Sequence, residues 1–146
     1  MLFLMRHGPA ENTSVTGKDR DRELTASGIR SVRRVIERLK DRAERPSKIV
    51  ASPFARARDT AKLVAEAYSL TVELDEALEA ERDPRDVIEA HLLSGQNVMV
   101  VGHDPWFSEV ASGYARGPIM MDKGMIVVFE VKEDGEVRER FRIRPT

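Results

Sequence analysis

Apolar and polar positions alternate along this chain in blocks, and the blocks predict strands and helices in turn. Strands are expected where about four to eight residues are continuously apolar or alternate with polar ones. They lie at residues 1–5, 48–51, 71–74, 97–101, 125–131 and 136–143. Helices are expected where apolar residues recur three or four positions apart. They lie at residues 26–39, 53–68, 84–93 and 105–114.

Capping and turn residues place the boundaries of these elements. Thr25 is expected to cap the first helix. Ser52-Pro53 and Asp83-Pro84 each combine a capping residue with a proline, which favours the first helical position. Asp134-Gly135 predicts a tight turn between the last two strands. The acidic segment 75–82 fits neither pattern clearly, so its structure stays open.

The order of the elements predicts an α/β fold. Strands and helices alternate through most of the chain, which favours a mostly parallel sheet with right-handed connections and helices on both faces. The two final strands follow one another directly and are expected to add an antiparallel edge. No internal repeat, low-complexity segment or interdomain linker interrupts the pattern. The prediction is therefore a single-domain three-layer sandwich over residues 1–146.

Composition narrows the classes of function. The chain has 146 residues, 41% hydrophobic and 34% charged, and a net charge of -1. A nearly neutral chain offers no overall attraction to nucleic acid or to a membrane. Without cysteine, disulfides and thiolate metal sites are excluded. The apolar start is too short for a signal peptide, and no run reaches the roughly 20 apolar residues of a membrane span. We therefore expect a cytoplasmic protein.

Three polar stretches follow three of the predicted strands. They are Arg6-His7-Gly8, Ser52-Pro53-Phe54-Ala55-Arg56 and Gly102-His103-Asp104. Ligands of open α/β sheets bind beyond the carboxyl ends of the strands, so we expect two histidines and two arginines to meet there. Taken singly, His7 and His103 have an ordinary interpretation as structural or turn residues, and Arg56 as a solvated helix residue. Their common position favours a function.

Two arginines and two histidines suit phosphoryl transfer. The planar guanidinium of Arg6 or Arg56 matches the oxygens of a phosphate. A neutral imidazole can attack phosphorus, which replaces one difficult displacement by two easier ones. The second imidazole can donate hydrogen bonds to the phosphoryl oxygens as charge spreads over them. Gly8 and Ser52 adjoin these residues and are predicted to help bind the phosphate, together with the amino end of the helix near Pro53.

Four sequence blocks carry a resemblance to a known family. They are Leu4-Met5-Arg6-His7-Gly8, Leu24-Thr25-x-x-Gly28, Ser52-Pro53-Phe54-x-Arg56-Ala57-x-x-Thr60-Ala61 and Val101-Gly102-His103. In this order they resemble the histidine phosphatase superfamily, which contains phosphoglycerate mutases and histidine acid phosphatases. The resemblance implies that His7 is the phosphorylated nucleophile, that Arg6 and Arg56 bind the phosphate, and that His103 completes the pocket. It also implies a mechanism that uses no metal and no cofactor.

The short chain looks most like the small phosphohistidine phosphatases of the SixA type. Larger relatives insert segments that cap the pocket, so the resemblance implies an open, shallow site suited to a phosphohistidine on a protein. Many relatives have a glutamate that protonates the leaving group, and the matching position here is Ala80, between Glu79 and Glu81. Either neighbour supplies the acid if the alignment shifts by one residue; otherwise segment 75–81 is a solvated acidic loop. A phosphoramidate needs this acid less than an alkyl phosphate, because imidazole leaves more easily than an alkoxide.

Two other functions stay open. A broad phosphatase for sugar phosphates or nucleotides would need a usable acid among Glu76, Glu79 and Glu81. A non-catalytic module that binds phosphorylated ligands would keep the pocket without turnover, although the presence of both histidines argues against it. Residues 19–22 are either substrate contacts or a salt-bridged surface loop. His91 is expected to be structural or exposed.

Overall fold

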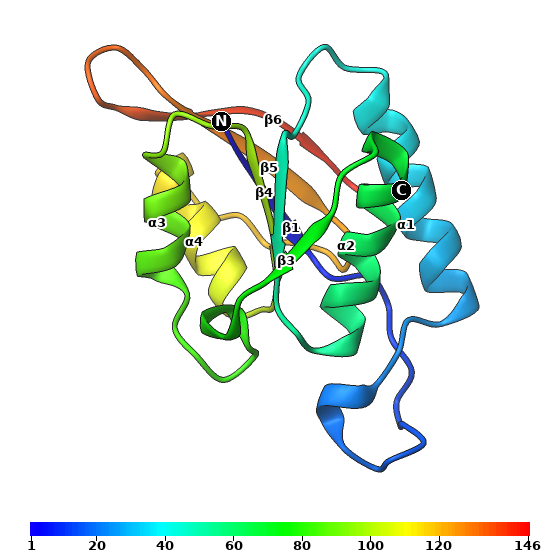
Figure 1. Cartoon of the computed structure of the whole chain (residues 1–146). Coiled ribbons are helices and arrows are strands. Elements are labelled where there is room, and N and C mark those ends of the chain that lie inside the picture. Colours follow the sequence, from blue (N-terminus) through cyan, green and yellow to red (C-terminus); the bar gives the residue numbers. More distant parts are fainter.

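Six strands form one mixed sheet in the computed structural model, which describes residues 1–146 (Figure 1). Their bounds are Leu2–Arg6 (β1), Lys48–Ala51 (β2), Val72–Leu74 (β3), Val98–Gly102 (β4), Ile126–Val131 (β5) and Val137–Ile143 (β6). The order across the sheet is β3-β2-β4-β1-β5-β6. The strands β3, β2, β4 and β1 pair with their neighbours in parallel, and β5 pairs antiparallel with both β1 and β6. The predicted α/β fold with an antiparallel edge is confirmed.

Helices cover both faces of the sheet. Their bounds are Ala26–Lys40 (α1), Ala55–Tyr68 (α2), Arg85–Leu92 (α3) and Trp106–Ala115 (α4), with short 3-10 helices at Asp19–Asp21 (η1) and Glu76–Leu78 (η2). α1 and α2 lie on one face, and α3 and α4 lie on the other (Figure 1). Successive side chains of a strand point to opposite faces. In β1, Phe3 and Met5 accordingly belong to the core under α1 and α2, whereas Leu2 and Leu4 belong to the core under α3 and α4.

The predicted start of α1 is correct, and the predicted starts of α2, α3 and α4 are each too early. Thr25 caps α1, because its Oγ1 accepts a hydrogen bond from Gly28 N at 2.8 Å. The predicted start of α2 at Pro53 is wrong: α2 begins two residues later, at Ala55. Ser52 does not cap α2, because its Oγ accepts from Phe54 N at 3.1 Å in a turn that precedes the helix.

The other two proline-led starts are also each one residue later than predicted. α3 begins at Arg85, after Pro84, and Asp83 accepts a hydrogen bond from Arg85 N at 3.0 Å. α4 begins at Trp106, with Pro105 at the N-cap. In all three cases the prolines lie in the turn that leads into the helix, rather than inside its first turn.

The carboxyl ends of β1, β2 and β4 meet at one edge of the sheet, because these strands are parallel neighbours. Arg6 is in register with Gly102, and Ala51 with Val101. The loop that carries η1 lies on one side of this edge and η2 lies on the other (Figure 1). The segments that follow the three strands therefore lie between η1 and η2.

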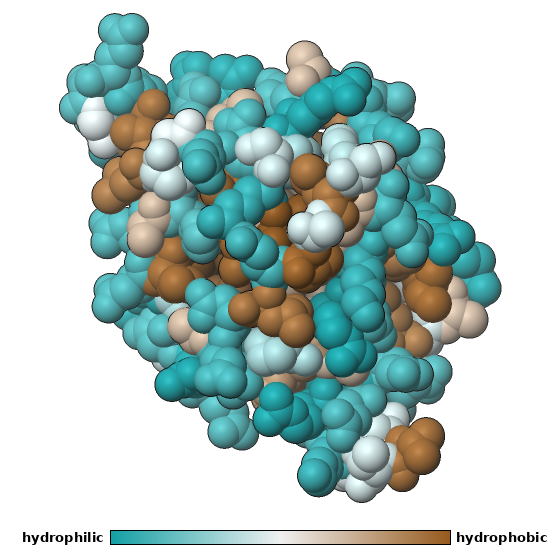
Figure 2. All heavy atoms as spheres, viewed as in Figure 1, coloured by the Kyte–Doolittle hydropathy of each residue, from teal (hydrophilic) through white to brown (hydrophobic).

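The surface agrees with the layered core. In Figure 2 this face is covered mostly by hydrophilic residues, and hydrophobic ones show in the middle, where β3 forms the edge of the sheet between the helical layers. Leu74 of β3 is one of the few exposed large apolar residues. No helix combines the length and the apolar character that crossing a membrane would require.

Candidate active site

His7 follows β1 directly and is nearly buried, with 7% of its surface exposed. Its Nδ1 lies 2.7 Å from the carbonyl oxygen of Gly8, which can only accept, so Nδ1 carries the ring proton. The free lone pair is then on Nε2, and this is the nitrogen that can act as a nucleophile. Burial lowers the pKa of His7 to about 4, and the charges of Arg56 and Arg6 act in the same direction. His7 is therefore neutral near pH 7.

His103 follows β4 and is buried beside His7, with 5.2 Å between the two ring centroids. Its Nε2 lies 2.9 Å from Ser52 Oγ, which already accepts a hydrogen bond from Phe54 N. The hydroxyl hydrogen of Ser52 can donate to Nε2, and in this tautomer the ring proton of His103 is on Nδ1. That Nδ1 is buried without a protein partner. The pKa of His103 is lowered to about 3, mainly by burial and in addition by the neighbouring His7 and Arg56.

Arg6 and Arg56 bring two guanidinium groups to the same edge. Arg6 ends β1, and its Nη1 donates to the carbonyl of Met121 at 2.9 Å and lies 3.7 Å from a carboxylate oxygen of Asp104. Arg56 lies in the first turn of α2 and is 5% exposed. Its Nη1 donates to the backbone oxygen of Asp19 at 3.0 Å, and its Nη2 donates to the Asp19 carboxylate at 3.2 Å. The Nε of each arginine is buried without a partner.

These contacts define what the cluster can do chemically. Arg6, Arg56 and His103 each hold a buried nitrogen that no protein group engages, next to the lone pair of His7. Buried donors without partners are costly unless a ligand satisfies them. A tetrahedral oxyanion with three free oxygens matches such donors and attracts both positive charges. The cluster is therefore suited to hold a phosphoryl group beside a neutral imidazole.

Gly8 and Ser52, which were predicted to help bind phosphate, lie in this cluster with protein partners of their own. Gly8 N donates to Thr60 Oγ1 at 3.0 Å, and Ser52 Oγ is shared between two protein groups. Thr60, which sequence reasoning did not single out, is fully buried and also donates to Arg56 O at 2.7 Å. It ties the loop after β1 to the first turn of α2. Its place in the block from Ser52 to Ala61 is the signal that could have found it.

Comparison with known proteins identifies the family. A family model described as Histidine phosphatase superfamily (branch 1) matches residues 2–89, more than half of the chain, and this range includes Arg6, His7 and Arg56. The chain belongs to the histidine phosphatase superfamily. It is a hydrolytic phosphatase. No curated protein sequence matches the chain.

Solved structures share the fold over almost the whole chain. The protein histidine phosphatase SixA, complexed with tungstate, has a TM-score of 0.85 at 25% identity, with 99% of this chain and 96% of that chain covered. A structure named as a phosphohistidine phosphatase SixA from Agrobacterium tumefaciens has a TM-score of 0.84 at 21% identity, with 99% and 97% covered. A mutant phosphoserine phosphatase from Entamoeba histolytica, in complex with phosphoserine, has a TM-score of 0.74 at 16% identity, with 99% and 97% covered.

The candidate acids of this histidine phosphatase differ in position. Glu79 follows η2, and its Oε2 lies 3.4 Å from Nη2 of Arg20. Arg20 lies over Phe54, 5.3 Å from the ring centroid, and Phe54 meets the ring of His103 edge-on at 5.2 Å. Glu79 is thus connected to the rim of the pocket. Glu81 is exposed and forms no ion pair.

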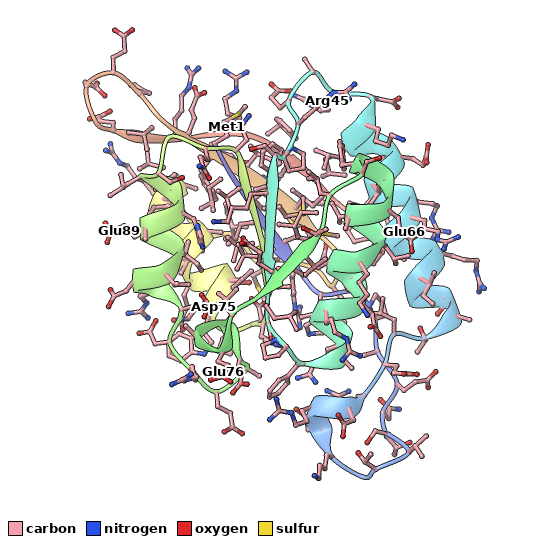
Figure 3. The ribbon with its side chains drawn as sticks, viewed as in Figure 1. Met1, Arg45, Glu66, Asp75, Glu76 and Glu89 are labelled. Carbon is pink, nitrogen blue, oxygen red and sulfur yellow. The ribbon has the colours of Figure 1, made fainter.

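The rest of the acidic segment forms the turn around η2. Asp75 accepts a hydrogen bond from Ala77 N at 2.9 Å and so caps η2. Glu76 is exposed and also lies at η2, as Figure 3 shows with both residues labelled. Of the three glutamates that were weighed as acids, only Glu79 is linked to the pocket through other side chains.

Residues 19–22, in the loop before α1, have features of both interpretations, a salt-bridged loop and a contact with the pocket. Asp19 accepts from Arg22 Nε at 2.8 Å, so the loop is salt-bridged, as one interpretation expects. Asp19 also contacts Arg56, so the loop reaches the predicted phosphate pocket as well. His91 is half-buried in α3, in agreement with a structural residue.

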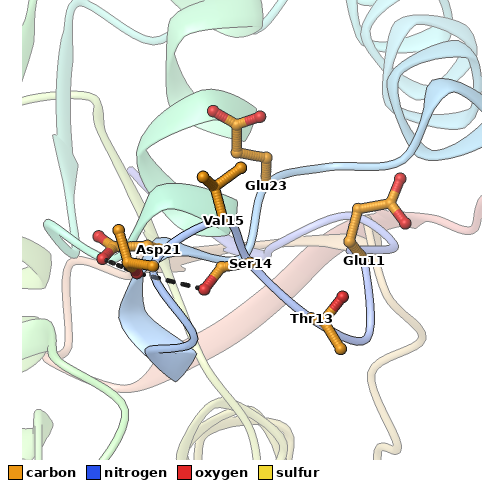
Figure 4. Close-up of a pocket in the computed structure, with 7 residues that line it drawn as sticks. Glu11, Thr13, Ser14, Val15, Asp21 and Glu23 are labelled. Carbon is orange, nitrogen blue, oxygen red and sulfur yellow. Dashed lines mark hydrogen bonds between the residues drawn. The ribbon is translucent and has the colours of Figure 1, made fainter.

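A separate pocket of about 470 Å³ lies in the loop between β1 and α1 (Figure 4). Its lining residues are Glu11, Thr13, Ser14, Val15, Thr16, Asp21 and Glu23. This lining has three carboxylates and no cation, so it repels a phosphate rather than binding it. No group of three or more carboxylates, histidines or cysteines in the structure is arranged to hold a metal ion. This pocket is therefore distinct in chemistry from the cluster around His7.

Proposed function

We propose that this histidine phosphatase removes phosphate from phosphohistidine on proteins, through a phosphorylated His7. The observation that carries the proposal is the pairing of a neutral His7, whose lone pair is on Nε2, with three unpartnered donors from Arg6, Arg56 and His103. A nucleophile and a set of oxyanion donors in one buried cluster are the two parts that a covalent phosphoryl transfer needs.

The proposed cycle has two displacements at phosphorus. In the first, His7 Nε2 forms a bond to phosphorus while the bond from phosphorus to the substrate nitrogen breaks, and the leaving imidazole takes up a proton. In the second, water attacks the phosphorus, the bond to Nε2 breaks, and inorganic phosphate leaves with the proton balance restored by solvent. In both steps Arg6, Arg56 and His103 hold the three free oxygens, where charge is spread in the transition state.

The electrostatics support this cycle. A phosphoryl group brings two negative charges, and the guanidinium groups of Arg6 and Arg56 supply two positive ones. The low pKa of His7, caused by burial and by these charges, keeps the nucleophile unprotonated when the site is empty. Once a phosphoryl group is attached, its negative charge offsets the two guanidinium charges.

The positions of Glu79 and Glu81 favour phosphohistidine as the substrate. Glu79 is engaged by Arg20, and Glu81 is exposed, so neither carboxyl touches His7 or His103. An alkyl phosphate needs a strong proton donor because its leaving oxygen is basic, whereas imidazole leaves with little help. The likeness to the protein histidine phosphatase SixA, at 25% identity over 99% of the chain, supports the same substrate class. The proposed partner is a protein that carries phosphohistidine.

A second candidate is a phosphatase for small phosphate esters. The observation in its favour is the link from Glu79 through Arg20 and Phe54 to His103, which places one carboxyl at the rim. Release of Glu79 from Arg20 would make it available as an acid. For this candidate, Glu79→Gln lowers kcat for an alkyl phosphate about 100-fold or more, in the range of general acid catalysis, and leaves phosphohistidine cleavage nearly unchanged.

The test compares substrates with purified protein in the presence of EDTA. Phosphate release is followed from a phosphohistidine-carrying protein, from p-nitrophenyl phosphate and from a panel of sugar and nucleotide phosphates. The variants are His7→Ala and, as a matched control, His91→Ala. We expect the highest kcat/KM for phosphohistidine, loss of turnover in His7→Ala, and normal turnover in His91→Ala.

A trapping experiment checks the covalent intermediate. Radiolabelled substrate is mixed rapidly with the protein and quenched in alkali, because phosphohistidine survives alkali but not acid. Label on the wild type and none on His7→Ala supports the proposal. Full turnover in His7→Ala, or tight phosphate binding with no turnover of any substrate by the wild type, refutes it.

A further inference from the structure

Arg56 is held by a residue from a distant part of the chain. Both terminal nitrogens of its guanidinium donate to Asp19 in η1, Nη1 to the backbone oxygen at 3.0 Å and Nη2 to the carboxylate at 3.2 Å. A guanidinium has five N–H donors in a fixed plane. Two are therefore used by Asp19, and three, including the buried Nε, are left for a ligand. The contact with Asp19 thus sets both the plane of the group and the donors that stay free.

Asp19 is itself fixed, although its side chain is 61% exposed. Its Oδ1 accepts from Arg22 Nε at 2.8 Å, while its Oδ2 faces Arg56. Arg22 is anchored in turn by donating from Nη1 to the carbonyl of Glu11 at 2.8 Å. Partial burial acts to raise the pKa of Asp19, but the hydrogen bond from Arg22 and the charge of Arg56 outweigh it, so the carboxyl stays ionised.

We propose, taking Arg56 as the phosphate ligand of the proposed function, that Asp19 is a positioning residue for the reaction. It holds the Arg56 guanidinium so that the Nε side faces the phosphoryl group, and it acts only through Arg56. An arginine with a long flexible side chain would otherwise lose rotamer freedom each time it bound phosphate. Preorganisation by Asp19 removes that cost before the substrate arrives.

The experiment uses Asp19→Ala, Arg56→Ala and the double variant, with Asp21→Ala as the matched control. Asp21 is the other acid of η1, and its carboxylate accepts from Thr16 without contacting Arg56. For each protein, kcat and KM are measured with p-nitrophenyl phosphate, and the urea transition is recorded.

We expect Asp19→Ala to lower kcat/KM about 10- to 100-fold, the cost of a misplaced catalytic group, while a single cooperative urea transition shows that the variant is folded. Asp21→Ala should keep wild-type kinetics. In the Arg56→Ala background, adding Asp19→Ala should change kcat/KM less than about twofold, because residues that act through one another are not additive.

Two results overturn the positioning role while leaving the proposed function in place. One is a loss in Asp19→Ala that is equally large with and without Arg56. The other is wild-type kinetics in Asp19→Ala when Arg56→Ala and His7→Ala are both impaired. Normal kinetics in Arg56→Ala would instead refute the phosphate-binding role of Arg56, and with it the proposed function and the positioning role together.

Discussion

Mild acid should destabilise this protein through its buried histidines. His7 is 7% exposed and has a pKa of about 4, against 6.5 for an ordinary histidine. The folded protein therefore binds a proton at His7 only at a lower pH than the unfolded chain does. The pKa is lowered in the folded state, so the stability is complete above about pH 6.5 and is lost as the pH falls toward 4. At pH 5 the difference in the pKa of His7 between the folded and unfolded protein lowers the free energy of unfolding by about 2 kcal/mol.

The substitution His7→Gln isolates the contribution of His7 to this loss of stability, because glutamine is polar and does not titrate. The free energy of unfolding is measured by urea denaturation at pH 7.5 and pH 5.0 for the wild type, for His7→Gln and for His91→Gln. His103, with a pKa of about 3, contributes a similar loss that all three proteins share. Carboxylates whose pKa is lowered, such as Asp19 and Glu130, are still ionised at pH 5 and contribute little.

The expected result is a difference between proteins in their sensitivity to pH. His7→Gln should lose about 2 kcal/mol less than the wild type between the two pH values. His91→Gln should lose nearly as much as the wild type, because His91 is less buried than His7. An equal loss in the wild type and in His7→Gln would show that His7 is not held neutral in the folded protein, and it would refute the reasoning.

Three further predictions concern the supports of the pocket and its independence of metals. Thr60→Val removes the hydroxyl between Gly8 N and Arg56 O, so urea denaturation should show a loss of about 1–3 kcal/mol; an unchanged midpoint would contradict this role. Gly28→Ala would place a Cβ 2.2 Å from the backbone oxygen of Pro9, so thermal unfolding should reveal a loss of about 1–3 kcal/mol or more. Dialysis against EDTA should leave the rate of phosphate release unchanged, because the proposed cycle uses only side chains of the protein; a rate restored by added zinc or magnesium would disprove it.

Much of the fold could be predicted from the sequence because the relevant signals are local. The apolar run at residues 97–101 indicated a buried strand, and Val98–Gly102 is buried throughout. Thr25 indicated a helix start that its hydrogen bond to Gly28 N explains. The start of α2 was misplaced because Ser52 and Pro53 have the residue types of a helix start. The hydroxyl of Ser52 is used instead by Phe54 N and by the distant His103.

The candidate site was predictable as far as strand ends could locate it. The positions of His7, Arg56 and His103 followed from the rule that parallel strands end at one edge. The contact between Asp19 and Arg56 could not be predicted, because 37 positions separate them and no periodic pattern relates a 3-10 turn to a helix. The state of Glu79 depended in the same way on Arg20, a residue from another loop. Contacts between loops arise from the folded arrangement and leave little trace in residue order.

The central pairing of β1 with β4 has a consequence for how activity appears during folding. Leu2 pairs with Val98, so this contact closes a loop that spans most of the chain, whereas α1 and the β5–β6 hairpin rely on near neighbours. Contacts between distant residues carry the larger entropic cost and form more slowly. His7 and His103 follow β1 and β4 directly, so the closeness of their rings depends on this pairing. On refolding from urea, phosphatase activity should therefore return after the helical signal in circular dichroism, and it reports on completion of the whole sheet.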